Sequence, residues 1–310
     1  MKILYLTDQY GAHNRGTKPS IFLEMKRRGF DIVKAPVHSA GTNKINGPAL
    51  LAKIRAEGFT WVWIAHSWSQ FHGCTLEDIH DAGAKVLGFG FSDPYAWIPT
   101  KLNQYDAYAT NHYGTYNTLK NGSIPVTTII TAGDSSYHQD LGLDRDIDIL
   151  VFGLGSHLRF TPRNYRISLM TGILERFPDL NIQIYGQKWG DIPVKGYVKG
   201  DQFRTIINRS RLALDLQQPH APLAHRMFEC MMCGTPVITR ERPEIECLFG
   251  DWPLLGQYGG ISLEDAVTSI LDLPPDSWCA LSNDIKEYTL AQHDIGNRVD
   301  SLIEWFRELG

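Results

Sequence analysis

The chain has 310 residues, of which 43% are hydrophobic and 21% are charged, and its formal net charge is −4 at pH 7. These values are ordinary for a globular protein with a substantial core, and the length suits one large or two medium domains. A net charge this small gives no indication of a protein that must bind a polyanion.

The sequence shows no evident segment for targeting or membrane insertion. Met1 and Lys2 run directly into an apolar, strand-like stretch, with no signal segment between them. No window reaches the ~18 apolar residues of a membrane span. The five cysteines are scattered and odd in number, which argues against a disulfide framework. We therefore expect a cytoplasmic protein with no membrane span.

Short apolar runs, typical of buried parallel strands, alternate with helix-like segments through the first half of the chain. The strands are expected at 2–7, 30–35, 61–65, 85–91, 105–110 and 126–131. The helices are expected at 20–29, with Ser20 as its N-cap, and at 49–57, 76–83 and 114–120. This alternation predicts a doubly wound α/β domain around a parallel sheet.

The same alternation of strands and helices begins again after a charged connector at 141–148. Strands are expected at 149–153, 181–185, 212–216 and 235–239, and helices at 165–177, 202–210, 224–232 and 295–309. The prediction is two Rossmann-like α/β domains facing a cleft: an acceptor-side domain of residues 1–143 with the C-terminal helix (about 295–310), and a donor-binding domain of residues 144–294. Parallel sheets bind ligands beyond the carboxyl ends of their strands, so this arrangement suits a reaction between two substrates.

The most informative segment is 224–249, with the sequence AHRMFECMMCGTPVITRERPEIECLF. Arg226 and Glu229 are three residues apart on an expected helix, which places both near one face. The Arg226 guanidinium could bind a diphosphate, and Glu229 could accept hydrogen bonds from two sugar hydroxyls. An intrahelical ion pair on a solvated face is the alternative interpretation.

This segment resembles the donor-binding signature of GT-B glycosyltransferases, in which a helix carrying Glu runs into a small-residue turn and then a strand. With Arg three residues before the Glu, it is most similar to the spore-maturation type of glycosyltransferase-like proteins. Further resemblances occur in the family's order: FSDPYAW (91–97), YDAYATN (105–111), TTIITAGD (127–134), VFGLGSHLRFTPR (151–163), IYGQKWG (184–190), GYV (196–198) and NRSRLALDL (208–216).

The resemblance implies a hexosyl- or pentosyltransferase with the GT-B fold, which binds a nucleotide-diphosphate sugar in its C-terminal domain. It implies no cofactor besides this co-substrate and no metal, because Arg, Lys and helix N-termini stabilise the leaving diphosphate in this fold. The implied donor-binding residues are Gly153, Gly155, Arg159, Arg163 and Lys188 at the diphosphate, Tyr197 and Val198 at the base, Glu229 at the ribose, and Arg226, Gly234 and Thr235 at the phosphates or sugar.

One position departs from the family pattern. Many retaining enzymes of this fold carry a second Glu eight residues before the helix Glu, and here that position is Ala221. Asp215 and His225 are the candidates to contact the donor sugar instead, so His225 joins the donor-binding set. The departure leaves open whether the reaction retains or inverts the anomeric configuration, and whether the chain is active.

An inverting reaction needs a positioned base that deprotonates the acceptor hydroxyl. Asp93 follows the fourth expected strand and is the first candidate, although Asp93-Pro94 is as well suited to starting a turn. His66, after the third expected strand, is the second candidate.

Aromatic and polar residues follow the expected strands of the first domain, where their rings could stack on a sugar or a base. Ordinary packing is the more common role for such residues. The residues proposed for the acceptor side are Tyr10, His13, Trp68, Tyr95 and Trp97.

The acceptor stays open among a glycan, a small molecule, a protein and a modified base in DNA, such as a hydroxymethylated pyrimidine. The slightly basic first domain keeps the DNA hypothesis in view. A third hypothesis, prompted by Ala221, is a catalytically silent sugar-nucleotide-binding or coat-associated protein. Cys230 and Cys233 are spaced as CxxC, but without a second pair they do not predict a metal site.

Overall fold

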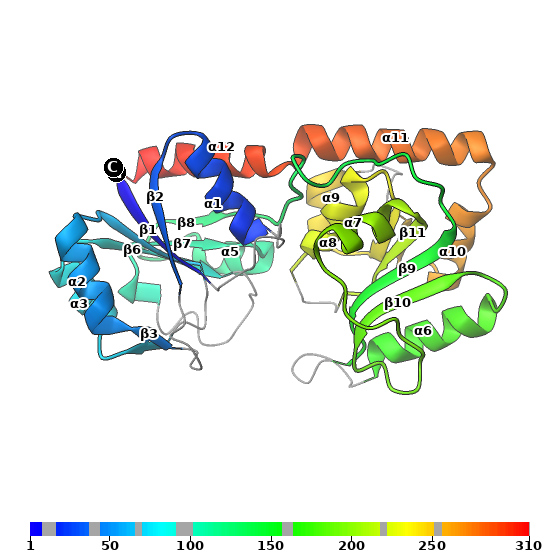
Figure 1. Cartoon of the computed structure of the whole chain (residues 1–310), viewed down its shortest axis with the longest axis horizontal. Coiled ribbons are helices and arrows are strands. Elements are labelled where there is room, and N and C mark those ends of the chain that lie inside the picture. Colours follow the sequence, from blue (N-terminus) through cyan, green and yellow to red (C-terminus); the bar gives the residue numbers. More distant parts are fainter. Residues whose placement is uncertain are drawn as a thin grey trace. The chain divides into compact units, whose positions relative to one another are not determined.

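The chain folds into two compact units, Met1–Thr131 together with Ile295–Gly310, and Ala132–Asp294. Figure 1 shows the fold, which is a computed structural model. It describes residues 1–7, 17–36, 44–65, 70–90, 102–156, 164–217, 222–250 and 256–309.

A parallel sheet forms the centre of the first unit, in the strand order β2-β1-β4-β6-β7-β8. Its strands are β1 (Lys2–Thr7), β2 (Asp31–Pro36), β4 (Trp61–Ile64), β6 (Lys85–Gly90), β7 (Ala107–Thr110) and β8 (Val126–Thr128). Two short strands, β3 (Lys44–Asn46) and β5 (Gln70–His72), pair in parallel in a separate small sheet that the sequence analysis did not predict.

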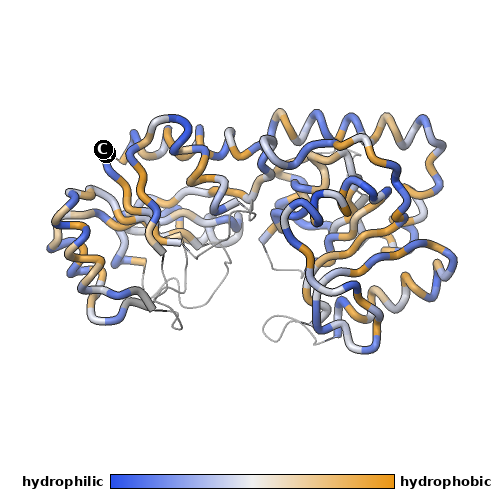
Figure 2. Tube along the Cα trace, in the orientation of Figure 1, coloured by the Kyte–Doolittle hydropathy of each residue, from blue (hydrophilic) through white to orange (hydrophobic). Residues whose placement is uncertain are grey.

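Helices cover both faces of this sheet. They are α1 (Thr17–Arg27), α2 (Gly47–Glu57), α3 (Leu76–Asp81), α5 (Tyr113–Leu119) and α12 (Ile295–Glu308), with a 3-10 turn at Leu102–Gln104. One face packs against α2 and α3 through an aliphatic cluster that includes Leu4, Ile54 and Ile79. The other face is aromatic, and the rings of Trp61 and Phe306 lie 5.8 Å apart. Figure 2 shows that hydrophobic residues concentrate along the strands, whereas the outer segments are more hydrophilic.

The first helix begins earlier than predicted. Ser20 was expected to cap it, but α1 starts at Thr17, and Ser20 is buried inside the helix. Pro19 explains the shift, because proline is well tolerated in the first turn, where its missing N–H would have no partner within the helix.

The second unit is built on another parallel sheet, in the order β10-β9-β11-β12-β13. Its strands are β9 (Ile147–Leu154), β10 (Ile182–Gln187), β11 (Ser210–Asp215), β12 (Val237–Arg240) and β13 (Gly256–Tyr258). Its helices are α6 (Tyr165–Arg176), α7 (Gly200–Asn208), α8 (His225–Met232), α9 (Pro243–Phe249), α10 (Leu263–Leu271) and α11 (Pro275–Gln292). Of these elements, β13, α9, α10 and α11 were not predicted.

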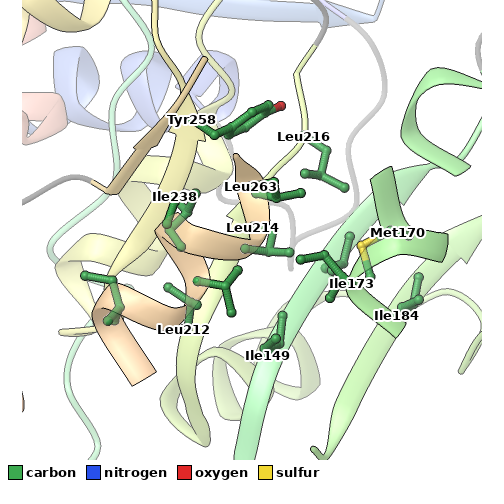
Figure 3. Close-up of a cluster of buried hydrophobic side chains, with 14 of the residues drawn as sticks. Ile149, Met170, Ile173, Ile184, Leu212, Leu214, Leu216, Ile238, Tyr258 and Leu263 are labelled. Atoms are coloured by element: carbon green, nitrogen blue, oxygen red, sulfur yellow. The ribbon is translucent and has the colours of Figure 1, made fainter. Parts of the chain in front are cut away.

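The core of the second unit lies between the sheet and helices α6 and α10 (Figure 3). Val151, Leu214 and Ile238 occupy neighbouring positions on three adjacent strands, and all three belong to this cluster. Tyr258 and Leu216 lie at one end of the cluster. Since Leu216 follows β11, this end marks the carboxyl edge of the sheet.

The two units divide between Thr131 and Ala132, whereas the sequence analysis placed the division near residue 143. Residues 132–143 belong with the second unit because side chains of α7 hold them. The Asn208 amide donates to the Gln139 carbonyl, and its oxygen accepts from the Leu141 N–H at 2.7 Å. Two separate parallel α/β sheets confirm the predicted fold class.

Candidate functional site

The carboxyl edge of the second sheet gathers charged side chains from several strands and helices. All five strands are parallel, so their carboxyl ends meet at this edge. A pocket opens here, and its lining includes Phe152, Arg166, Asp215, Gln217 and Arg226. Ligands of open α/β sheets bind at such edges, so this pocket is the candidate site.

Gly153, near the end of β9, is where two guanidinium groups converge. A side-chain carbon built on Gly153 would lie 3.4 Å from Nη1 of Arg226 and 3.5 Å from Nη1 of Arg166. Its backbone also has a φ of 127°, which side-chain-bearing residues rarely adopt. Glycine at this position therefore keeps the space next to two cations clear of side-chain atoms.

Arg166 is fixed in place by the ends of two strands. Its guanidinium donates to the carbonyls of Leu216 at 2.7 Å and Leu154 at 2.8 Å, and to the Gln217 side chain at 3.2 Å. Burial lowers the pKa of Arg166, and the nearby positive charge of Arg226 lowers it further. An arginine stays protonated under such conditions, so Arg166 is a rigid, partly buried cation.

Arg226 lies in the first turn of α8 and is half-buried. Across the part of the chain that the structure describes, its guanidinium has no hydrogen bond and no carboxylate oxygen within 4 Å. A partly buried cation without a counterion is costly unless an anion joins it. Since α8 also begins without a side-chain cap, its first N–H groups add to the attraction for an anion.

Glu229 lies one turn further along α8 and is only 4% exposed. Burial raises the pKa of its carboxyl to about 8, although the positive charge of Arg226 opposes this shift. Oε1 of Glu229 lies 3.6 Å from Nε2 of His138 and 4.0 Å from Nε2 of His225. The alternative of an ion pair with Arg226 on a solvated face is wrong, because Glu229 is buried and does not pair with Arg226.

His138 is held by a turn that begins at Asp134. The Asp134 N–H donates to Nδ1 of His138 at 3.2 Å, so the Nε2 atom that faces Glu229 carries the ring proton. Both side chains are almost fully buried. His138 was not among the predicted site residues, since its neighbours in sequence give no signal that links it to α8.

Asp215 ends β11, and the sequence analysis named it as a candidate to contact the donor sugar. It accepts a hydrogen bond from Thr239 Oγ1 at 3.2 Å and lies 3.8 Å from Nη2 of Arg242. Burial raises its pKa, and the positive charges of Arg242, Arg166 and Arg226 oppose that rise. The structure therefore places Asp215 within the arginine group at the pocket.

The shape of the backbone at Gly153 depends on Gly186 in β10. Trp189 Nε1 donates to the Gly153 carbonyl at 3.1 Å, and a side-chain carbon on Gly186 would lie only 1.8 Å from the same oxygen. We expect Gly186→Ala to lower the free energy of unfolding by about 3 kcal/mol or more, because two strand backbones cannot separate without losing their ladder.

Urea unfolding of the variant tests this expectation, with Gly142→Ala as the matched control. Gly142 also has a positive φ, of 62°, but a side-chain carbon there would meet nothing within 4 Å. Gly142→Ala should therefore cost only the backbone strain, about 1–2 kcal/mol. Equal losses in the two variants would contradict the role of the close contact at Gly153.

The other donor-binding residues of the prediction have different surroundings. Lys188 is exposed, with a φ of 62°, and its carbonyl oxygen would lie 2.7 Å from a side-chain carbon on Gly155. Tyr197 is 66% exposed, and Lys199 Nζ lies 5.5 Å from its ring centre. Val198 is half-buried. The segments that contain these residues follow β10, next to β9 in the sheet.

Gly234 and Thr235 are not brought to this group. Both follow the C-terminus of α8 and precede β12, so they lie at the opposite, amino-terminal edge of the sheet. Thr235 is fully buried and donates to the Ile207 carbonyl at 2.9 Å. Arg145 donates to Thr235 Oγ1 and to the Cys233 carbonyl. The prediction that Gly234 and Thr235 sit near the phosphates is corrected accordingly.

Several predicted site residues lie outside the described residues. These are Asp93 and His66 for catalysis, Arg159 and Arg163 for the donor, and Tyr10, His13, Trp68, Tyr95 and Trp97 for the acceptor; Ala221, the departure from the family pattern, lies outside them too. Conversely, Arg166, Arg240 and Arg242 lie at the carboxyl edge of the second sheet but were not predicted. An isolated arginine in a sequence gives no indication of which residues it will contact in the fold.

Neither a metal-ligand group nor a membrane-spanning helix occurs in the residues that the structure describes. Within those residues, no group of three or more His, Cys, Asp or Glu side chains is placed to hold a metal ion. Among the same residues, no helix is long and apolar enough to cross a membrane.

Comparisons with known proteins bear on both units. Residues 166–304 match a family model described as glycosyl transferase-like. No curated protein matches the sequence. Three solved structures cover 98% or more of both chains. A glycosyltransferase from Rickettsia africae has a TM-score of 0.69 at 10% identity, and covers 99% of this chain and 98% of its own.

The other two structures cover a similar share of both chains. A sucrose-phosphate synthase from Thermosynechococcus elongatus has a TM-score of 0.69 at 12% identity, with coverage of 100% and 99%. Anabaena HepE, in complex with UDP and glucose, has a TM-score of 0.68 at 10% identity, with coverage of 99% for each chain. This chain therefore has the two-domain, Rossmann-like GT-B fold, and its C-terminal half matches a glycosyl transferase-like family model.

Proposed function

We propose that the chain is a glycosyltransferase that moves a sugar from a nucleotide-diphosphate sugar to a hydroxyl acceptor. The second unit would bind the donor at the carboxyl edge of its sheet. Support comes from the glycosyl transferase-like match over residues 166–304, and from structural neighbours such as Anabaena HepE, which was solved with UDP and glucose. Within this proposal, the spore-maturation type is the subfamily whose signature the α8 segment resembles.

The observation that carries the proposal is the convergence of Arg166 and Arg226 on Gly153. A diphosphate is a compact dianion with several acceptor oxygens, and two guanidinium forks next to an open backbone supply the donors that it needs. As the glycosidic bond breaks, negative charge grows on the leaving diphosphate. Fixed cations in a partly buried pocket stabilise that charge without reorganising, which accounts for metal-independent transfer in this proposal.

Glu229 would bind the ribose of the donor. It lies one turn after Arg226 on α8, so a nucleotide whose phosphates contact Arg226 can direct its ribose hydroxyls toward this carboxyl. His138 Nε2, at 3.6 Å, would hold the carboxyl in place from the opposite side. Asp93 and His66 remain the proposed candidates for the base in the first unit.

Thermal unfolding with a panel of UDP, ADP, GDP, CDP and dTDP tests the proposal. At least one of these should raise the melting temperature, because a ligand at 100 times its Kd stabilises the folded state by ~2.7 kcal/mol. Arg226→Gln should weaken binding of that diphosphate by about 10- to 100-fold and leave binding of the free nucleoside unchanged, since only the diphosphate gains a charge-assisted bond.

Arg176→Gln is the matched control, because Arg176 lies exposed in the last turn of α6, at the far end from Arg166. It should bind every nucleotide like the unmodified chain. A panel in which no nucleoside diphosphate binds would refute the proposal. Binding of the donor without any release of its sugar, to water or to an acceptor panel that includes hydroxymethylated DNA, would instead favour the catalytically silent protein.

A further inference from the structure

The carboxyl edge of the second sheet holds more positive charge than a diphosphate requires. Arg166, Arg226 and Arg240 each lack a carboxylate oxygen within 4 Å, as far as the described residues extend. The carboxylate of Asp215 lies 3.8 Å from Arg242, so this anion already has a cation of its own. Two of the three remaining cations meet at Gly153, and Arg240 is left over.

Arg240, the last residue of β12, is held at the carboxyl edge of the sheet by Tyr165. Its Nη1 donates to the Tyr165 hydroxyl at 2.6 Å, and its guanidinium carbon lies 5.8 Å from the Tyr165 ring centre. The Tyr165 hydroxyl lies 3.4 Å from that of Tyr258. Within the described part of the chain this is the one hydrogen bond of Arg240, so most of its five N–H groups are available to a ligand.

Tyr165 also links Arg240 to the diphosphate site. It is the first residue of α6, directly before Arg166, and the hydroxyls of Tyr165 and Tyr258 both interact electrostatically with Arg166. Arg240 is thus bonded to a residue that directly precedes Arg166 in the chain, and Figure 3 shows Tyr258 at the end of the core that faces this edge.

The sheet register sets the distance between Gly153 and Arg240. Val151 and Ile238 both pair with Leu214 of β11, which lies between β9 and β12. Gly153 and Arg240 each lie two residues further on, so they occupy the same level across β11. Adjacent strands are ~4.8 Å apart, which separates the two positions by ~10 Å. A hexose ring with its C6 substituent can bridge a distance of this order from a diphosphate.

We propose that the donor sugar is acidic, a hexuronate whose carboxylate binds Arg240 while its diphosphate binds Arg166 and Arg226. This inference rests on the proposed function and adds the class of sugar to it. The Tyr165 hydroxyl, which accepts from Arg240, orients the guanidinium. A neutral hexose leaves Arg240 without an anion and so forgoes a charge-assisted hydrogen bond.

Calorimetric titration with matched donors tests the inference. The pairs are UDP-glucuronate against UDP-glucose and UDP-galacturonate against UDP-galactose, or the equivalent pair on whichever base the nucleotide panel selects. We expect the hexuronate to bind about 10- to 100-fold more tightly in at least one pair. Arg240→Gln should abolish this preference while keeping the affinity for the neutral sugar. Tyr165→Phe should reduce the preference, because it frees the guanidinium but keeps its charge.

The outcomes separate this inference from the proposed function. If no nucleoside diphosphate binds, the proposed function fails, and the sugar class fails with it. If the nucleotide binds but neutral and acidic sugars bind equally, only the inference is overturned. A preference for hexuronate that survives Arg240→Gln also overturns it. Arg176→Gln, on the same helix as Tyr165 but exposed at its other end, should keep the full preference.

Discussion

Asp93→Asn is expected to lower the rate of donor turnover by about 10²–10⁴-fold, the usual contribution of a general base. The first unit is a parallel sheet, and its strand β6 ends at Gly90, three residues before Asp93. Asp93 itself lies outside the described residues, so this role follows from the sequence alone. Asparagine keeps the shape and the turn-forming ability of aspartate but cannot accept the proton of an acceptor hydroxyl.

The measurement is release of the nucleoside diphosphate from the donor, with water as the acceptor. Donor affinity and the melting temperature should not change. Asp81→Asn is the matched control, since Asp81 is an exposed residue at the end of α3, and it should keep the full rate. A loss of rate accompanied by a loss of stability would support a turn-forming role only. Full activity would eliminate Asp93 and direct attention to His66, or to a retaining reaction in which the leaving phosphate assists the acceptor.

Glu229→Gln is expected to remove a pH dependence of stability and to make the protein more stable at pH 8 by roughly 3–5 kcal/mol. Burial raises the pKa of Glu229 from 4.5 to about 8. The folded state therefore holds this proton more tightly than the unfolded chain does. The resulting stability is fully present below pH 4.5 and is lost as the pH rises to about 8. Glutamine mimics the protonated carboxyl and does not titrate.

Urea unfolding of both proteins at pH 5, 6, 7 and 8 measures this difference. The gap between them should be small at pH 5 and should widen with each step. Glu287→Gln, an exposed glutamate on α11, is the control and should follow the unmodified chain at every pH. A constant gap between Glu229→Gln and the unmodified chain would show that Glu229 does not bind a proton over this range. In that case a hydrogen bond from His138 Nε2 would hold Glu229 as a carboxylate.

The two-sheet architecture could be predicted from the sequence because each parallel strand is a contiguous apolar run. Strands such as β4 (WVWI) are buried on both faces, so their composition alone marks them. Elements with weaker local signals were missed, among them the three-residue strand β13 and the long helix α11, which buries few of its residues. The start of α1 was misplaced because a capping signal at Ser20 competed with a proline that is compatible with the first turn.

The candidate site could be predicted from the sequence only in part. Arg226 and Glu229 were named because they stand three residues apart on one helix, within a segment that resembles a known signature. Their environments could not be predicted this way: Glu229 is buried, and its partner His138 comes from a distant turn. In contrast, Gly234 and Thr235 share the same segment, but α8 carries them to the opposite edge of the sheet.

The sequence by itself thus determined the two parallel sheets and the helix that carries Arg226, because these depend on periodicities within contiguous residues. Only the tertiary structure decided which cations share a pocket. Arg166 from α6 and Arg226 from α8 converge on Gly153, and Arg240 from β12 lies at the same edge, because parallel strands end there and bring together residues that are far apart in sequence. Burial, which sets the charge of Glu229, is likewise a property of the packed fold, since it depends on neighbours that no local pattern specifies.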